Sequence, residues 1–292
     1  MPRTPIQQFT GVDNLNPEFN VPLNGMLEGE NIYIDDEQRV KGRDGYVLQS
    51  AGNFHSIWNN TARDVTLVVQ DDKIQSVRSG FALIDLVSGL TGTGKMSYVE
   101  ASTDTVIYSN GVEIGQLVDQ VDTPFVVPSE SYKRTPVPGH LLAFLNARLY
   151  MASTGVLWFT DAYTYNVDRR IGFFQFKSYI TLLHAVDDGL YVSDSERTYF
   201  VKNDPPSKIE VHPYPAIPYN SQVTHSERFS IEGLPTGKVV MWASEKGLVV
   251  GGNGGIVFNV THTHYAMPAA GRGGGLISEE NGNYQFVVNL FN

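Results

Sequence analysis

The chain of 292 residues contains no cysteine and few charged side chains. The absence of cysteine excludes a disulfide framework and a thiolate metal site. Charged residues make up 18% of the chain, and the 41% of hydrophobic residues can form a sizeable core, which argues against disorder. Lysine and arginine (21) are outnumbered by aspartate and glutamate (31). The resulting net charge of −10 argues against a surface that neutralises nucleic-acid phosphates.

Long hydrophobic runs and amphipathic helical spacing are also missing. The N-terminal stretch "MPRTPIQQFTGVD" has no apolar signal core, and no run approaches transmembrane length. We therefore expect a soluble protein made in the cytoplasm. Short runs of β-branched and aromatic residues alternate with turns along most of the chain. This pattern predicts an all-β fold.

Five of these runs resemble one another, and each reads as strand, turn, strand, turn, strand. Examples are "LLAFLNARLYMASTGVLWFTD" and "ITLLHAVDDGLYVSDSERTYFVK". An apolar residue anchors each middle strand, and subtraction of the residue numbers gives spacings of 39, 43, 41 and 58. A period near 40 with several strands per unit is typical of a β-propeller blade. The anchors are Leu67, Val106, Leu149, Leu190 and Leu248.

The two chain ends predict how a ring of blades closes. A sixth unit begins at "LISEENGNYQFVVNLFN" and ends after about two strands, while "ENIYIDD" and "RVKGRDGYVLQS" near the N-terminus offer further strands. A blade shared by both ends removes two open sheet edges. We therefore expect about six blades, with five to seven as the open range. The ring closes by pairing of the N- and C-terminal strands, residues 31–48 with residues 276–291.

The predicted organisation is an extended N-terminal arm, residues 1–25, followed by a single β-propeller domain, residues 26–292. A proline-rich insertion at residues 203–220 lies within the longest repeat spacing and is expected to be an ordered but irregular surface loop. The stretch "GRGGGL", residues 271–276, is expected to be a flexible connector before the last unit. Its alternative is an anion-binding nest.

One stretch matches a nucleotide-binding loop. In "SGLTGTGKM", residues 88–96, Gly89, Gly94 and Lys95 fit the pattern G-x-x-x-x-G-K, whose backbone amides cradle phosphates. Such a loop needs a following helix and a serine or threonine that ligates magnesium. Residue 96 is methionine, and the next residues read as strands. We interpret the stretch as a glycine-rich turn between two blades.

Other candidate chemistry is sparse. His262 and His264 would face the same side of a strand. No carboxylate or third histidine lies at a spacing typical of metal ligands, so solvated histidines on a strand edge are favoured over a metal site. The acidic pairs Asp71-Asp72 and Asp187-Asp188 fall at predicted turns, where aspartate caps its own backbone. We therefore predict no catalytic, cofactor-binding or metal-ligating residues, no cofactor and no enzyme activity.

The segment from Gly11 to Trp58, "GVDNLNPEFNVPLNGMLEGENIYIDDEQRVKGRDGYVLQSAGNFHSIW", is the most distinctive part of the chain. Its glycine-led entry, its apolar stretch and the "ENIYIDDEQRVKGRDGY" before the first blade resemble bacteriophage tail hub or nozzle proteins related to the packaged-DNA stabilisation proteins of short-tailed phages. "STGVLWFTDAYTYN" and "LLHAVDDGLYVSDSERTYFV" are similar to consecutive blades of such hubs. The likeness covers most of the chain in layout, and the chain is shorter than a typical hub.

The resemblance implies a structural virion protein of a phage tail or head–tail connector, which forms a ring around the DNA exit channel and helps to retain or conduct the genome. The implied partners are other copies of the chain, with six-fold symmetry favoured, and the portal, adaptor or other tail proteins, with tail fibres or spikes as further candidates. DNA would pass through without specific binding, and no membrane is involved. The implied location is the virion, after synthesis in the host cytoplasm, and a tail component of a long-tailed phage fits equally.

Two other classes stay open. One is a phage-associated carbohydrate-binding or glycoside-hydrolase propeller, which would gather carboxylates or aromatic rings at one mouth of the propeller. The other is an unrelated scaffold propeller for protein partners. The fold alone does not choose among these classes, because propellers support many functions.

Overall fold

The computed structural model describes residues 11–17, 20–22, 24–26, 32–34, 39–42, 47–125, 127, 132–229, 231–261, 265, 267–268, 270–280 and 283–291. Within these residues the regular structure consists of β-strands and short 3-10 turns, with no α-helix. No helix in this part of the chain is long and apolar enough to span a membrane. The predicted all-β fold is confirmed. The chain divides into two compact units, Leu48–Pro213 and Met1–Val47 with Tyr214–Asn292.

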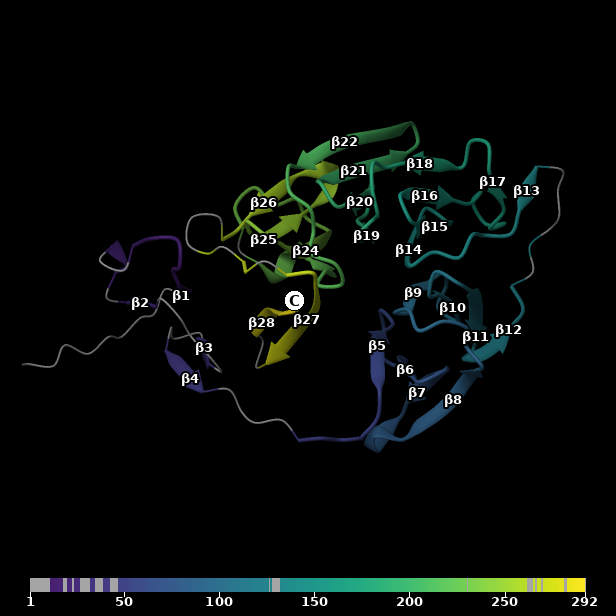
Figure 1. The fold of residues 1–292 in the computed structure, drawn as a ribbon, viewed down its shortest axis with the longest axis horizontal. Helices are drawn as coiled ribbons and strands as arrows, with labels where there is room; N and C mark the ends of the chain where they lie inside the picture. Colours follow the sequence, from purple (N-terminus) through teal and green to yellow (C-terminus); the bar gives the residue numbers. More distant parts are fainter. Residues whose placement is uncertain are drawn as a thin grey trace, which may run out of the picture. The chain divides into compact units, whose positions relative to one another are not determined.

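The unit Leu48–Pro213 contains four four-stranded antiparallel sheets among its described residues (Figure 1). In each sheet the strands follow one another in chain order. Most neighbours are joined by short turns, and the longest connection, between β16 and β18 of the third sheet, contains the separate strand β17 (Val167–Asp168). The first sheet comprises β5 (Phe54–Asn59), β6 (Thr66–Gln70), β7 (Lys73–Val77) and β8 (Leu83–Ser88), and the second β9 (Ser97–Glu100), β10 (Thr105–Ser109), β11 (Ile114–Val118) and β12 (Val121–Thr123). The third comprises β14 (Leu141–Leu145), β15 (Arg148–Ser153), β16 (Val156–Phe159) and β18 (Phe173–Gln175), and the fourth β19 (Leu182–Ala185), β20 (Leu190–Ser193), β21 (Thr198–Asn203) and β22 (Pro206–His212).

The core of this unit lies between successive sheets. Leu149 and Met151 of β15 pack in a cluster with Val99 and Ile107 of the second sheet. Tyr150 and Ala152, which alternate with them along the strand, point to the other side, into a cluster with residues of the fourth sheet. Side chains alternate between the two faces of a strand, and here both faces are covered, so the strand reads as a continuous apolar run. The sheets therefore stack face to face.

The other unit contains one four-stranded sheet and three two-stranded pairs among its described residues. The sheet comprises β23 (Gln222–His225), β24 (Lys238–Ser244), β25 (Gly247–Gly251) and β26 (Val257–Asn259). The pairs are the hairpin of β27 (Arg272–Glu280) and β28 (Asn283–Phe291), the antiparallel β3 (Ile32–Ile34) and β4 (Val40–Gly42), and the parallel β1 (Gly11–Val12) and β2 (Gly25–Met26). Of the predicted arm, residues 1–10 lie outside the described residues.

The repeat is real, but one anchor residue is offset. Four anchors lie on the second strand of their sheets, whereas Leu248 lies on β25, the third strand of its sheet. A better marker is the serine that ends the second strand before the next turn. This serine is Ser109, Ser153, Ser193 and Ser244 in four of the five four-stranded sheets of the described chain. The hydrophobic pattern misaligned the last sheet because its second and third strands are both buried and apolar.

The predicted irregular loop at residues 203–220 is wrong in its first half. Pro206–His212 form β22, which pairs with β21 as the fourth strand of its sheet. A proline is tolerated at the first residue of a strand, so Pro206 does not prevent pairing. Further along, Ala216 bridges Ser244 and is buried. This segment is therefore packed rather than a surface loop.

The predicted flexible connector at residues 271–276 is also wrong, because Arg272–Glu280 form β27. Gly273 donates its N–H to the carbonyl of Pro218 (2.8 Å), and the Gln222 side chain donates to the carbonyl of Gly275 (2.6 Å). Gly275 lies so close to the backbone of Asn220 that no side chain would fit. The glycines serve close packing of two backbone segments.

The predicted closure of the ring is not tested by these pairings. In the described residues β27 pairs with β28 and β3 pairs with β4, and no pairing joins the two hairpins. Closure through residues 31–48 and 276–291 stays a prediction.

Candidate functional site

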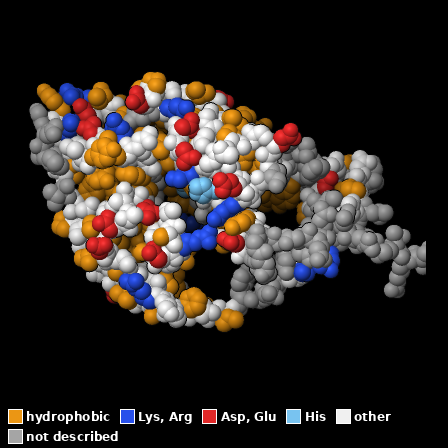
Figure 2. Space-filling model, turned by 180° about the vertical axis from the view of Figure 1, so that it is seen from behind, with side chains coloured by type: hydrophobic (Ala, Val, Ile, Leu, Met, Phe, Trp, Pro, Cys, Tyr) orange, Lys and Arg blue, Asp and Glu red, His pale blue; other side chains and the backbone are white. Residues whose placement is uncertain are grey.

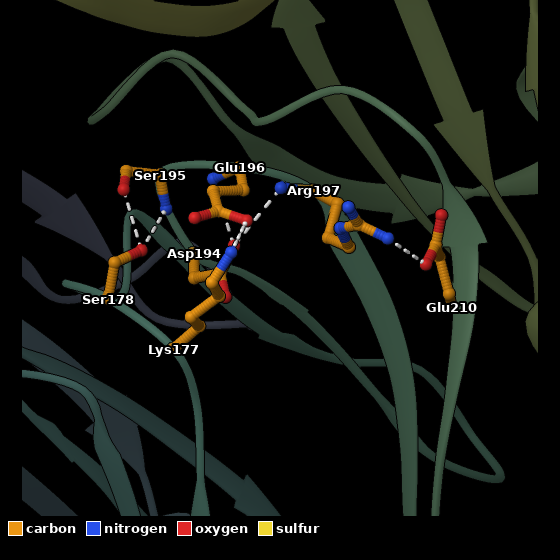
Figure 3. Close-up of polar contacts among 7 residues, drawn as sticks. All are labelled: Lys177, Ser178, Asp194, Ser195, Glu196, Arg197 and Glu210. Atoms are coloured by element: carbon orange, nitrogen blue, oxygen red, sulfur yellow. Dashed lines mark hydrogen bonds and ion pairs between the residues drawn. The ribbon is translucent and has the colours of Figure 1, made fainter.

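The turn between β20 and β21 is organised around a buried carboxylate (Figure 3). Asp194 is 0% exposed, and its Oδ1 accepts hydrogen bonds from the backbone N–H groups of Glu196 (2.9 Å) and Arg197 (3.0 Å). Its Oδ2 is buried without a hydrogen-bond partner among the described residues. An aspartate that bonds the backbone two and three residues ahead favours a tight turn.

The outer side of the same turn is attached to the segment between β18 and β19. The Ser195 N–H and hydroxyl group both donate to Ser178 Oγ, at 3.0 and 2.6 Å, and Lys177 Nζ lies 2.7 Å from Glu196 Oε2 (Figure 3). These contacts are exposed, with 72% of the Lys177 side chain accessible, so the ion pair adds little stability by itself. Within the described residues these hydrogen bonds join the two serines to each other.

The second sheet uses the same turn between β10 and β11. Asn110 Oδ1 accepts from the N–H groups of Val112 (2.9 Å) and Glu113 (3.0 Å), as Asp194 does in the fourth sheet. The preceding Ser109 donates to the carbonyl of Glu113 (2.6 Å), and its counterpart Ser193 donates to the carbonyl of Arg197. Our sequence analysis did not identify the side-chain acceptors, Asn110 and Asp194, that organise these two turns. The signal was present as serine followed by Asn or Asp at the end of a second strand.

The phosphate-loop match at residues 88–96 is confirmed as a turn between two sheets, since β8 ends at Ser88 and β9 begins at Ser97. Two of its backbone N–H groups already donate hydrogen bonds to side chains of the protein. Thr91 donates its N–H to Glu113 Oε1 (2.6 Å), and Met96 donates its N–H to Ser56 Oγ (2.8 Å). A carboxylate at this place repels a phosphate, so the stretch lacks the electrostatic environment of a nucleotide site.

The histidines of the described residues are buried to different degrees. His140 stacks on Tyr179 with ring centroids 4.2 Å apart, and its Nε2 lies 2.7 Å from the carbonyl oxygen of Ile180. Burial lowers the pKa of His140 below its usual value and lowers the pKa of His184 to about 4. His55 Nδ1 lies 2.8 Å from Ser56 Oγ, and the pKa of His55 is lowered by burial and then by the charge of Lys95.

The predicted histidine pair, His262 and His264, lies outside the described residues. Among the residues that are described, no three histidine, aspartate or glutamate side chains form a group that could hold a metal ion. The acidic pairs lie at turns as predicted, Asp71-Asp72 between β6 and β7 and Asp187-Asp188 between β19 and β20. Asp188 pairs with Lys202 of β21 at 2.9 Å.

Comparison with known proteins gives the fold. No family model and no curated protein matches the chain. Among solved structures, it is similar to the WD40 beta propeller domain of Doa1 (TM-score 0.53, 14% identity, 89% of this chain and 81% of that chain). The fold is that of a β-propeller.

Two further likenesses agree. One is to BBS1N, solved in complex with ARL6DN (TM-score 0.52, 12% identity, 89% of this chain and 86% of that chain). The other is to the extracellular domain of a putative hybrid two-component system of B. thetaiotaomicron (TM-score 0.51, 10% identity, 85% of this chain). The propeller spans 33% of that last chain. At these identities the likeness concerns the fold alone.

Proposed function

We propose that this propeller is a structural virion protein of a bacteriophage tail or head–tail connector. It forms a ring around the DNA exit channel and helps to retain or conduct the genome. The observation that carries the proposal is the resemblance of the segment Gly11–Trp58 and of two later blade sequences to phage tail hubs or nozzles. The β-propeller fold agrees with what that resemblance implies.

The contacts between successive sheets support a role as a rigid building block. Besides the bonds between Ser178 and Ser195, Gly139 donates its N–H to Ser109 Oγ across the second and third sheets (3.1 Å). His140, which precedes the third sheet, contacts the carbonyl of Ile180, which precedes the fourth. Rigid subunits with a fixed shape suit closed rings, where each copy repeats the same contact.

The proposed propeller has about six blades. The described chain contains five four-stranded sheets, and the hairpin β27–β28 offers two strands of a further blade. We propose that β3 and β4 complete it, so that the N- and C-terminal strands close the ring. A single propeller would then span residues 26–292, preceded by the arm of residues 1–25. Five to seven blades remain within this proposal.

The acidic balance of the chain suits passage of DNA. With a net charge of −10, the protein repels phosphates on average, so DNA can slide through a lumen without specific binding. The proposed partners are other copies of the chain in a ring, six-fold favoured, and portal, adaptor or other tail proteins, with tail fibres or spikes beyond them. The proposed location is the virion, after synthesis in the host cytoplasm.

Electron microscopy of the purified chain and of native particles tests this proposal. We expect ring-shaped oligomers, antibody labelling at the tail, and incomplete tails or leaking genomes in particles that lack the protein. The isolated protein should bind duplex DNA negligibly at physiological salt. A free monomer outside virions that hydrolyses a polysaccharide would overturn the proposal in favour of a glycoside-hydrolase propeller.

A further inference from the structure

A small ribbon outside the sheet repeat carries an unusual surface. Strands β13 (Lys133–Arg134) and β17 (Val167–Asp168) pair with each other, and β17 lies in the excursion between β16 and β18 of the third sheet. Each of the four large sheets in this unit has four strands. Among the described residues of the unit, β13 and β17 are the one pair of strands outside these sheets. The ribbon is therefore an addition that the repeat itself does not require.

The two segments that carry these strands, residues 132–134 and 160–173, are called the ribbon from here on, and several of their large apolar side chains are exposed. Tyr163 is 83% exposed, Ile171 74% and Tyr132 61%. Tyr163 also has a positive φ of 66°, which is uncommon for a residue of its size. Tyr132 contacts Arg170, the residue before Ile171, so the exposed tyrosine and isoleucine flank the paired strands. Exposed large apolar side chains on paired segments indicate an interaction surface more strongly than scattered ones do.

The ribbon is also basic in an acidic protein. Residues 132–134 and 160–173 contain Lys133, Arg134, Arg169 and Arg170 but only two acidic residues, Asp161 and Asp168, a net charge of +2 against −10 for the whole chain. Lys133 lies 2.7 Å from Asp161. The upper left of Figure 2, where the ribbon lies after the rotation from Figure 1, shows Lys and Arg side chains together with acidic and hydrophobic ones.

One of the three arginines of the ribbon, Arg170, is held in place before any partner binds. Arg170 donates to both carboxylate oxygens of Asp168 (3.0 and 2.7 Å), and its guanidinium lies 4.0 Å from the centroid of the Tyr132 ring. These bonds lower the pKa of Asp168 to about 2, so the pair stays charged. Preorganised arginine and tyrosine side chains are the residues that dominate binding energy at protein interfaces.

The geometry points to the ribbon β13–β17 as the surface that binds an acidic face of a second copy of this chain. Charge complementarity selects this occupant. The residues outside the ribbon include 29 acidic and 17 basic side chains (31 minus 2 and 21 minus 4), a net charge of −12, so acidic side chains predominate on a neighbouring copy. This inference rests on the proposed ring, and it names the side chains that hold neighbouring copies together.

A ring built this way is heterologous, because a basic patch on one copy meets an acidic patch on the next. Such a contact is sensitive to salt at its rim and to loss of the buried aromatic anchors at its centre. Duplex DNA is the competing occupant of a basic surface. The acidic balance of the whole chain disfavours it, since repulsion from the rest of the protein opposes phosphate contacts.

The experiment compares the full chain with three variants by sedimentation velocity and native mass spectrometry over a range of protein concentrations. Arg169→Glu reverses an exposed charge of the ribbon. Tyr163→Asn removes an exposed ring and introduces asparagine, which tolerates the positive φ at this position. Arg272→Glu is the matched control, a reversal of the same exposed residue type outside the ribbon. Circular dichroism and thermal unfolding confirm that each variant is folded.

We expect Arg169→Glu and Tyr163→Asn each to weaken self-association by about tenfold or more, and Arg272→Glu to leave it within about twofold of wild type. Assembly of the ribbon variants at wild-type strength would overturn this inference and leave the proposed ring standing. A wild-type chain that stays monomeric at every concentration and salt would overturn both. Specific binding of duplex DNA at physiological salt, abolished by Arg169→Glu, would replace the second copy with nucleic acid as the occupant.

Discussion

The backbone of Asn220 lies directly against Gly275, with no room for a side chain at that glycine. Asn220 is itself fully buried, and its Oδ1 accepts the N–H of Ala243 (2.9 Å). At the glycine-rich start of β27, the backbone of Gly275 therefore packs directly against the backbone of Asn220. Pairing with β28 makes this stretch a strand, and the contact with Asn220 explains why it contains glycine.

Gly275→Ala is expected to destabilise the protein by about 1–3 kcal/mol, because the new Cβ overlaps the Asn220 backbone. Gly274→Ala is the control, since nothing lies within 4 Å of a Cβ built there and its φ is ordinary. Its effect should stay within about 0.5 kcal/mol. Urea unfolding of both variants measures the difference, and equal midpoints would show that β27 does not pack as described.

Asp194→Ala is expected to cost about 1–3 kcal/mol, since it removes the acceptor of two backbone N–H groups in a buried turn. Asp194→Asn should recover most of that loss because Asn110 performs the same role in the second sheet. Thermal unfolding of the two variants is the measurement. A turn that needs the negative charge itself would show no recovery with asparagine.

Acid is expected to weaken the fold through His184. Burial lowers its folded-state pKa to about 4 from the ordinary 6.5, so the unfolded chain binds a proton first as the pH falls. The neutral form of His184 therefore makes its full contribution to the free energy of unfolding above pH 6.5. This contribution is lost as the pH falls from 6.5 to about 4, which lowers the free energy of unfolding by up to about 3 kcal/mol. Urea midpoints at a series of pH values test this. His184→Gln should flatten the dependence in that window, and an unchanged slope would assign the effect to other groups.

Lys95→Ala is expected to leave folding intact and to reveal no lost nucleotide binding. The N–H of the neighbouring Met96 is bonded to Ser56 Oγ, and Glu113 occupies the N–H of Thr91, so no phosphate cradle is open. Isothermal titration with ATP and magnesium is the measurement. Binding at micromolar strength that disappears in Lys95→Ala would contradict this interpretation.

Deletion of residues 1–48 tests the proposed closure. If β3 and β4 complete the blade of β27 and β28, the deletion leaves two open sheet edges and should cause aggregation or lower the unfolding temperature by about 5 °C or more. Light scattering and differential scanning calorimetry report the two effects. A truncated protein that unfolds at the temperature of the full chain would show that closure lies elsewhere.

The sequence alone predicted the all-β architecture and the repeat. Strand runs such as that of β15 are apolar on both faces, and turns such as Asn110-Gly111 supply the positive φ that a tight turn needs. These signals are local, because strand alternation and turn conformation depend on residues a few positions apart. The acidic pairs and the glycine-rich turn at residues 88–96 could be interpreted for the same reason.

Other features were decided by tertiary contacts. The glycines of β27 have no side-chain pattern, and their pairing with β28 makes them a strand, while the close approach of the Asn220 backbone requires glycine at position 275. Pro206 begins β22 because β21 offers it an open edge. The strands of the ribbon β13–β17 are two residues long and distant in the chain, and each is too short to carry a periodic signal. Such elements exist only when a distant segment supplies their hydrogen bonds, and that partner cannot be read from the local sequence.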